Sequence, residues 1–441
     1  MFFVGKLWAV TRNIALILLM ILAIYGFGRA IQLSLDSHDQ GSRGPYLQML
    51  SEQAVTLKWQ TSDADMPTVR YGQNQVDLNR HAVVSGSRTK HEVRLSGLSP
   101  ATRYYYHISG KESWHGSFHT APLAGSDAPI RLWVTGDQGE TGSIQNEVRD
   151  AALQWAIDNQ RYERPLFDFW ITTGDNAYRS GTIVQFQNKF FEPYADILAN
   201  IPVWPAYGNH DARRWAFFEL FSLPRLAESG GTPSHTEHFY SFDYGQLRVV
   251  MLDSEASSLA ADGAMARWLK NDLASTTQPW RIAVMHHPAY TKGSHDSDNP
   301  RDSSGRIFRV RENILPLLEG LGVDLILTGH SHSYERSHSI ACHYQPSSSW
   351  KPSYLRDDQS PYRKGVGVVH MVIGSSAKLD VAALDHPAMP ISHNLTGSVI
   401  IDIEGDTLIS RFIGQDGTII DEFEITRGND GLHQTINCDD L

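Results

Sequence analysis

The chain has 441 residues, of which 41% are hydrophobic and 20% are charged. This length and composition suit a folded protein of two or three domains. Its 38 Lys and Arg against 49 Asp and Glu give a formal net charge of −11, which argues against nucleic-acid binding as the main function. The 20 His are more informative, because several of them lie in the polar clusters described below.

The first predicted element is an apolar run at residues 14–27, which Lys6 and Arg12 precede. Positive residues before a short apolar stretch predict a secretory signal peptide or an uncleaved signal anchor within residues 1–33. The run is short for a membrane span, although apolar residues nearer the N-terminus would lengthen it. A buried helix is the remaining alternative. Under the first two interpretations, the rest of the chain is either membrane-anchored on the extracytoplasmic side or secreted or periplasmic.

Alternating apolar and polar side chains, broken by turn residues, mark residues 44–122. Such alternation is typical of half-buried strands. The predicted strands are residues 55–59, 68–71, 91–95 and 103–108. Several short strands this close together indicate a β-sandwich. Residues 95–106 resemble the corner before a late strand of a fibronectin type III domain, and a Pro/Gly/Ser-rich linker follows at residues 121–129.

Beyond the linker, residues 128–427 alternate continuous apolar strands with helical stretches. The predicted strands are residues 130–135, 167–173, 201–207, 280–285, 323–328 and 366–373. Helices are predicted from Ser143, as N-cap, to Trp155, and at residues 264–274 and 308–321. Hairpins are predicted at residues 238–253 and 397–425. Continuous apolar strands with helices between them imply a sheet that is covered on both faces.

Five short clusters of metal-binding side chains each follow an apolar, strand-like run. They are Gly136-Asp137-Gln138-Gly139, Gly174-Asp175-Asn176-Ala177-Tyr178, Gly208-Asn209-His210-Asp211, His286-His287-Pro288 and Gly329-His330-Ser331-His332. Their mixed oxygen and nitrogen donors suit Zn, Fe or Mn, and the absence of Cys argues against a structural zinc site. Ligand crevices of α/β sheets lie at the carboxyl ends of strands, where these clusters stand. The set is enough for two adjacent metals, which phosphate-ester hydrolysis at a binuclear centre requires.

The ordered motifs GDQG, GDNAY, GNHD, HHP and GHSHSYERS resemble those of the metallophosphoesterases, and specifically the purple acid phosphatases. The resemblance covers roughly residues 44–426. It implies an α/β (α+β) sandwich of two β-sheets flanked by helices, preceded by an all-β fibronectin type III-like domain. It also implies a hydrolase that acts on phosphoric ester bonds, of the acid phosphatase type.

The resemblance assigns two metal ions to the motif residues. The first, ferric iron in the family, would be held by Asp137, Asp175, Tyr178 and His332. The second, a divalent Zn, Fe or Mn ion, would be held by Asp175 as a bridge with Asn209, His286 and His330. Taken singly, these residues also fit helix caps, turn positions and core imidazoles, and their joint order is what favours metal binding. Tyr178 has the further alternative of only donating a hydrogen bond beside the metal.

Two histidines are candidate catalytic residues. In the resemblance His210 faces the substrate phosphate and leaving group, and His295 lies on a loop where plant-type relatives place substrate-binding histidines. Otherwise His295 is a surface residue. The implied reaction is phosphomonoester hydrolysis by in-line attack of a metal-bound hydroxide. A phosphodiesterase or nucleotidase on the same scaffold fits the motifs equally well, and a non-catalytic surface binding protein is a third hypothesis.

The expected partners are a small phosphorylated substrate and, through the N-terminal segment, a membrane, whereas the oligomeric state is open. The two cysteines, Cys342 and Cys438, both lie in polar, loop-like surroundings. In an oxidising compartment they could pair and tie the C-terminal tail, residues 428–441, to the loop after Tyr334. The alternative is two independent thiols.

Overall fold

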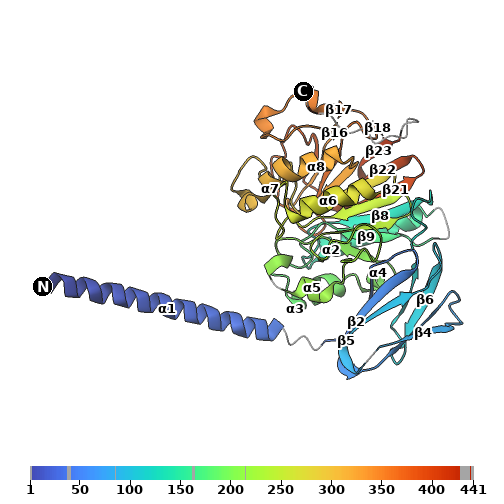
Figure 1. The fold of residues 1–441 in the computed structure, drawn as a ribbon, viewed down its shortest axis with the longest axis horizontal. Helices are drawn as coiled ribbons and strands as arrows, with labels where there is room; N and C mark the ends of the chain where they lie inside the picture. The colour runs from blue at the N-terminus through green and yellow to red at the C-terminus, as the bar shows by residue number, and fades with distance from the viewer. Residues whose placement is uncertain are drawn as a thin grey trace. The chain divides into compact units, whose positions relative to one another are not determined.

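A computed structural model describes residues 2–36, 41–84, 86–160, 164–213, 215–427 and 438. The chain divides into two compact units, residues 1–41 and 42–441. The first unit holds α1 (Phe2–Asp36) (Figure 1). In the described part of the chain, no helix has both the length and the apolar character that crossing a membrane requires. The signal peptide or anchor stays a prediction, and the tail at residues 428–441 lies outside the described residues except for Cys438.

The second unit begins with a sandwich of two small antiparallel sheets, whose strands group together in Figure 1. One sheet contains β1 (Arg43–Gln48), β2 (Ala54–Asp65) and β5 (Arg88–Ser96). The other contains β4 (Arg80–Val83), β3 (Thr68–Gly72), β6 (Arg103–Ile108) and β7 (His115–His119). In β5 the apolar Val93 and Leu95 are buried while Glu92 and Arg94 are exposed, as a sheet with one buried face requires. The predicted β-sandwich is confirmed.

The rest of the second unit is built on two seven-stranded sheets. The first of these sheets has the order β10 (Val203–Pro205), β9 (Phe169–Thr172), β8 (Ile130–Thr135), β21 (Gly397–Glu404), β22 (Thr407–Gly414), β23 (Ile419–Thr426), β18 (Tyr362–Arg363). The second has the order β11 (Tyr240–Tyr244), β12 (Leu247–Met251), β13 (Trp280–Val284), β14 (Leu325–Thr328), β19 (Val369–Ile373), β15 (Tyr334–Arg336), β20 (Ile391–His393). A separate pair joins β16 (Ser339–Ile340) and β17 (Leu355–Asp357).

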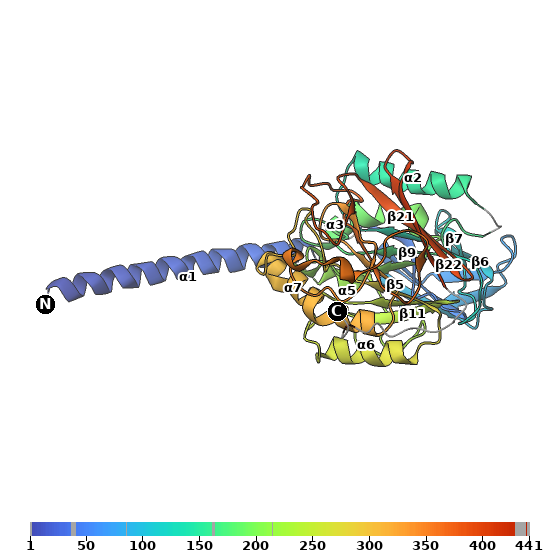
Figure 2. The same cartoon turned by 90° about the horizontal axis from the view of Figure 1, so that it is seen from above.

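The two seven-stranded sheets pack face to face through aromatic side chains. Phe169 of the first sheet meets Phe242 of the second at a ring-centroid distance of 5.4 Å, and Phe412 meets Tyr334 at 4.0 Å. Helix α2 (Ser143–Asp158) packs on β21 and β22, and Figure 2 shows α6 (Ala264–Ser275) on the opposite side of the strands. The expected sandwich of two sheets flanked by helices is therefore confirmed.

The shorter helices lie in the connections between strands. They are α3 (Ile183–Phe186), α4 (Ala195–Leu198), α5 (Ala216–Leu220), α7 (Arg306–Arg309) and α8 (Leu315–Gly320). A π-helical turn, Val310–Ile314, joins α7 to α8, so the helix predicted at residues 308–321 is confirmed with an irregular centre. The prediction of Ser143 as an N-cap is wrong. Gly142 occupies that position, and Ser143 is the first helical residue.

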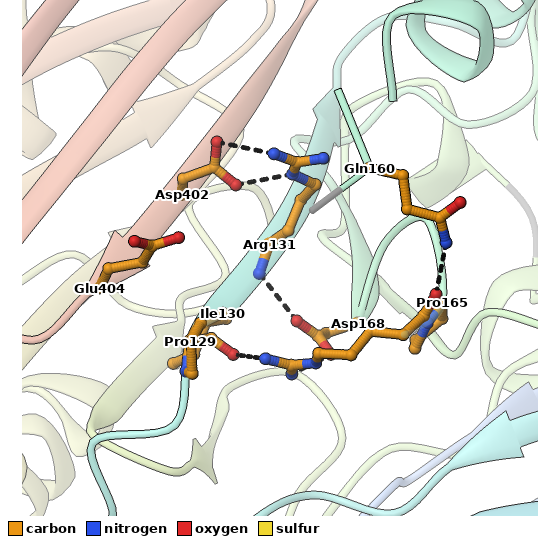
Figure 3. Close-up of a pocket in the computed structure, with 9 residues that line it drawn as sticks. Pro129, Ile130, Arg131, Gln160, Pro165, Asp168, Asp402 and Glu404 are labelled. Carbon is orange, nitrogen blue, oxygen red and sulfur yellow. Dashed lines mark hydrogen bonds and ion pairs between the residues drawn. The ribbon is translucent and has the colours of Figure 1, made fainter. Parts of the chain in front are cut away.

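The amino ends of β8 and β9 carry a charged network on the edge of the sheet away from the five polar clusters. Arg131 pairs with Asp402 at 2.6 Å, and its backbone N–H donates to Asp168 at 2.7 Å (Figure 3). These side chains surround a pocket of about 40 Å³. The network fastens β8 to β21 and to the start of β9, which indicates a structural role.

The sandwich of strands β1 to β7 is joined to the part of the chain that holds the two seven-stranded sheets by one buried and one partly buried hydrogen bond. The Tyr46 hydroxyl donates to the carbonyl of Leu220, and the Tyr106 hydroxyl donates to that of Ala199, both at 2.7 Å. Both acceptors lie on segments that flank β10 and the Asn209 cluster. In addition, Cys342 and Cys438 form a disulfide with their Cα atoms 5.6 Å apart.

Candidate metal centre

The five polar clusters lie directly after β8, β9, β10, β13 and β14. The first three of these strands are parallel neighbours in one sheet, and the last two are parallel neighbours in the other. Because the sheets pack face to face, the clusters meet where the strands end. Hydrogen bonds cross between them: the backbone N–H of His330 donates to Asp137 at 2.8 Å, and His286 bonds the carbonyl of Thr173 at 2.9 Å.

The backbone turns sharply at three of the predicted ligands. Asp137, Asp175 and His330 have φ values of 56°, 54° and 69°, in the left-handed region that non-glycine residues rarely adopt. Such strain concentrates where a side chain must be aimed at a site. Neighbouring loops also approach closely, since a Cβ on Gly208 would lie 2.2 Å from the backbone nitrogen of Asp175.

Three of the predicted ligands form a first ligand group. The Tyr178 hydroxyl lies 2.7 Å from Asp137 Oδ1 and 3.2 Å from His332 Nε2. The distance between Asp137 Oδ1 and His332 Nε2 is 3.6 Å. The Nδ1 atom of His332 bonds the carboxylate of Asp380, which can only accept a hydrogen bond. The proton of His332 is therefore on Nδ1, and the lone pair of Nε2 points at the group.

Four other ligands form a second ligand group around His286 Nε2. This atom lies 3.0 Å from Asn209 Oδ1, 3.1 Å from His330 Nδ1 and 3.4 Å from Asp175 Oδ1. Its neighbour His286 Nδ1 donates to the Thr173 carbonyl, so Nε2 is the ring nitrogen that faces the group, and it can bind a metal ion when the ring is neutral. The second ligand group therefore gathers two side-chain oxygens and two ring nitrogens.

The tautomer of His330 follows from a chain of hydrogen bonds. The Ser303 hydroxyl donates to Asp302 at 2.8 Å, because a carboxylate can only accept. Ser303 Oγ, at 2.6 Å from His330 Nε2, must then accept the proton of that nitrogen. His330 Nδ1 is left with a lone pair that points into the second ligand group.

Asp175 lies between the two ligand groups. Ligand atoms of Asp137, Asp175 and His286, all buried, lie within 4.8 Å of one another. The Asp175 carboxylate also accepts from the backbone N–H of His210 at 2.8 Å. All the predicted ligands thus come together in two adjacent groups that share one carboxylate.

The electrostatics of the centre favour a cation. Burial opposes protonation of His286, but the carboxylates of Asp175 and Asp137 outweigh burial and raise its pKa to about 10. Burial and the same two carboxylates raise the pKa of the Tyr178 phenol. Lone pairs that converge on one point repel each other unless a cation lies among them. The oxygen and nitrogen donor set fits two ions of the Fe, Zn or Mn kind.

The two predicted catalytic histidines lie beside the ligand groups. The His210 ring contacts the Tyr178 ring at a centroid distance of 4.4 Å, and its Nδ1 donates to the carbonyl of Arg179 at 2.7 Å. The His295 ring stacks on His330 at 3.8 Å, with its Nδ1 2.8 Å from Asp302. Both side chains are partly exposed, which places them on the open side of the centre.

Sequence reasoning missed the residues that orient the ligands. Asp380, Asp302 and Ser303 hold imidazoles, yet none of them belongs to a motif. Asp211 belongs to the Asn209 cluster, and its buried carboxylate accepts from the backbone N–H groups of Gly208 and Asn176 at 3.0 Å. Burial and the nearby Asp175 raise the pKa of Asp211 to about 7. The sequence Asp-Ser-Ser-Gly at residues 302–305 is a local signal of a turn or loop.

Known proteins carry the same fold and domain order. Residues 130–334 match the calcineurin-like phosphoesterase family, and residues 44–121 match the purple acid phosphatase N-terminal domain. A purple acid phosphatase from yellow lupin (Lupinus luteus) seeds, PPD1, superposes with a TM-score of 0.68 and 18% identity, over 88% of this chain and 75% of that one. That likeness shows the fold.

Curated relatives are similar at low identity. Purple acid phosphatase 23 of Arabidopsis thaliana is 28% identical over 281 residues, which are 57% of this chain and 58% of that protein. Acid phosphatase type 7 of Mus musculus is 28% identical over 310 residues, which are 65% of this chain and 64% of that protein. The matched stretches thus span less than two thirds of these relatives. The chain is a purple acid phosphatase-like, calcineurin-like metallophosphoesterase, with a domain before it that matches the purple acid phosphatase N-terminal domain.

Proposed function

We propose that the protein is an acid phosphatase-type phosphomonoesterase with two metal ions, Fe³⁺ and a divalent Zn, Fe or Mn ion. One observation carries the proposal. Oxygen and nitrogen lone pairs converge in two adjacent groups that share the Asp175 carboxylate. A shared carboxylate is the ligand that two neighbouring cations need, because it reduces their mutual repulsion.

The two ligand groups are the proposed binding sites of the two ions. Asp137, Tyr178 and His332 would hold the first ion with Asp175, and Asn209, His286 and His330 would hold the second with the same carboxylate. When bound, the ions supply Lewis acidity that polarises the phosphoryl group and makes water a nucleophile near neutral pH. Hydrogen bonds from the ligand imidazoles to Asp380, Ser303 and the Thr173 carbonyl keep the lone pairs directed at the ions.

His210 is the proposed general acid. Its Nδ1–H donates a hydrogen bond to the Arg179 carbonyl, so Nε2 is the atom that can give a proton to the leaving oxygen of the substrate. Burial lowers the pKa of His210 from its usual 6.5, although Asp175 opposes this effect. A group with a lowered pKa is protonated only in acid, so the proposal includes an acid optimum. His295, held by Asp302, is the proposed second contact to the substrate.

The proposed site of action is outside the cytoplasm, either secreted or periplasmic, or on a membrane anchor. The disulfide between Cys342 and Cys438 supports this proposal, because disulfides persist in oxidising compartments.

The test is metal analysis of the full chain combined with a phosphatase assay. We expect two metal ions per chain and hydrolysis of p-nitrophenyl phosphate that is faster at pH 5 than at pH 8. Removal of the ions by a chelator should abolish hydrolysis. A chain that binds no metal, or that hydrolyses neither this monoester nor bis(p-nitrophenyl) phosphate, would contradict the proposal. Faster hydrolysis of the diester would favour a phosphodiesterase.

A further inference from the structure

Lys378 lies beside the first ligand group. It follows β19 on the segment that also carries Asp380, the partner of His332. Its ammonium nitrogen lies 5.0 Å from the centroid of the Tyr178 ring, and the side chain is half-buried. The same ring contacts His210. Two basic side chains, Lys378 and His210, therefore lie against the tyrosine whose hydroxyl belongs to the first ligand group.

Among the residues that the structure describes, Lys378 forms no hydrogen bond and no ion pair. Asp380, the nearest carboxylate in sequence, is engaged by His332. Lys292, which lies on the loop after β13, is different because it pairs with Asp296 at 2.5 Å and Asp298 at 2.9 Å. The charge of Lys378 acts on the Asp380 carboxylate, but that carboxylate is exposed to solvent and forms no direct ion pair with the ammonium. An anion that enters the site from solution would give the half-buried ammonium a direct ion pair.

We propose that Lys378 binds the phosphoryl group of the substrate and makes the site prefer phosphomonoester dianions to phosphodiester monoanions. This inference rests on the proposed phosphatase function and narrows its substrate class. At pH 7 a monoester carries about one more negative charge than a diester, because its second pKa is about 6. A fixed cation beside the ligand groups stabilises that extra charge, and a hydrogen bond between two charged groups is about twice as strong as a neutral one.

The competing interpretation is that Lys378 only packs on the Tyr178 ring as a cation–π contact. The two interpretations differ in what a neutral side chain of similar length would do. In Lys378→Met the hydrocarbon stem and the ring contact remain, but the charge is lost. If the Lys378 charge interacts only with the Tyr178 ring, anion binding is the same in Lys378→Met as in the parent chain. If the Lys378 charge binds the phosphoryl group, anion binding is weaker in Lys378→Met.

The test measures binding of inorganic phosphate to the purified full chain by calorimetry at pH 7, with metal content determined in parallel. We expect Lys378→Met to raise the Kd of phosphate by about 10-fold or more while both ions are retained. The kcat/KM for p-nitrophenyl phosphate should fall by a similar factor, and that for bis(p-nitrophenyl) phosphate by less than about 3-fold. Lys378→Arg, which keeps the charge, should recover much of the phosphate binding.

Lys111 provides a matched control, because its ammonium lies 5.5 Å from the Trp114 ring in the N-terminal domain. Lys111→Met should leave the Kd of phosphate unchanged. An unchanged Kd in Lys378→Met, loss of a metal ion, or equal losses on the two esters would overturn the inference. If phosphate binding weakens but the parent chain hydrolyses neither ester, the phosphatase proposal fails and the assignment of Lys378 stands. If the parent chain binds no phosphate, both fail.

Discussion

At the scale of single residues, the positions of the histidine ring protons decide which nitrogens can bind a metal ion. His286, His330 and His332 each give one ring proton to a fixed acceptor, and each turns its other nitrogen toward a ligand group. Asp137, Asp175 and Asn209 add oxygens that present lone pairs to the same groups. When hydrogen-bond acceptor atoms face one another in a buried site, their repulsion is unfavourable unless a cation lies among them. Two carboxylates thus favour positive charge where these oxygen and nitrogen atoms converge, either as a proton on His286 or as a metal ion in its place, and this is why we assign a metal centre.

His210 is outside the ligand groups, so its removal should affect the reaction more than the metals. We expect His210→Ala to keep both ions and to lose about 10²–10⁴-fold in kcat on alkyl phosphates, which is the usual size of a general acid contribution. The loss should be smaller on p-nitrophenyl phosphate, whose leaving group departs as a stable anion. On alkyl phosphates, the parent rate should fall as pH rises above the lowered pKa of His210, and the variant should lose that fall.

His81→Ala on the exposed surface of β4 is the control and should change neither metal content nor rate. Equal losses on alkyl and nitrophenyl phosphates would point to phosphate binding by His210 in place of proton transfer. Loss of an ion from His210→Ala would place this residue among the ligands.

At the scale of elements, the strands and the motifs were predictable from sequence because their signals are local. The strand predicted at residues 130–135 is β8, and the regions of β9, β13 and β14 were also anticipated. The short strands β15, β18 and β20 were missed, since they have two or three residues and depend on tertiary pairing. For the same reason Asp380 and Lys378, which come from a loop far along the chain, could not be placed at the site from spacing.

The loop after β10 offers a test of how closely the ligand-bearing turns pack. A Cβ on Gly208 would lie 2.2 Å from the nitrogen and 2.3 Å from Oδ1 of Asp175, so Gly208→Ala must push that carboxylate away. Misplacement of a reacting group by about 1 Å can cost about 10²-fold in rate, and we expect a loss of that order together with lower metal content. Gly320→Ala is the control, because its added Cβ would meet nothing within 4 Å. A fully active Gly208→Ala variant would show that the turn is not tightly packed.

At the scale of the whole molecule, structural links hold the catalytic part in place. Hydrogen bonds from Tyr46 and Tyr106 brace the segments that flank β10. The disulfide ties Cys438 to Cys342, which lies close to α8 because its backbone N–H donates to Glu319 at 2.9 Å. These links are long-range in sequence, and they fix regions that contribute no ligand to either ion.

The disulfide should matter for stability and not for catalysis. The two cysteines are 96 residues apart, and closing a loop of about a hundred residues lowers the entropy of the unfolded chain enough to stabilise by up to ~4–5 kcal/mol. We expect Cys342→Ser with Cys438→Ser to lower the midpoint of thermal unfolding while kcat at a temperature well below that midpoint is unchanged. Free thiols found by mass spectrometry in native protein from outside the cytoplasm would contradict the pairing.

We propose that the single carboxylate of Asp175 joins two metal ions, and metal analysis of Asp175→Asn checks this bridging role. The parent chain should hold two ions, and this variant should lose occupancy at both positions together with its phosphatase activity, because an amide is a neutral and weaker bridge. Asp262→Asn, an exposed position before α6, should keep two ions and full activity. An Asp175→Asn protein that retains two ions per chain and most of its rate would contradict the bridging assignment.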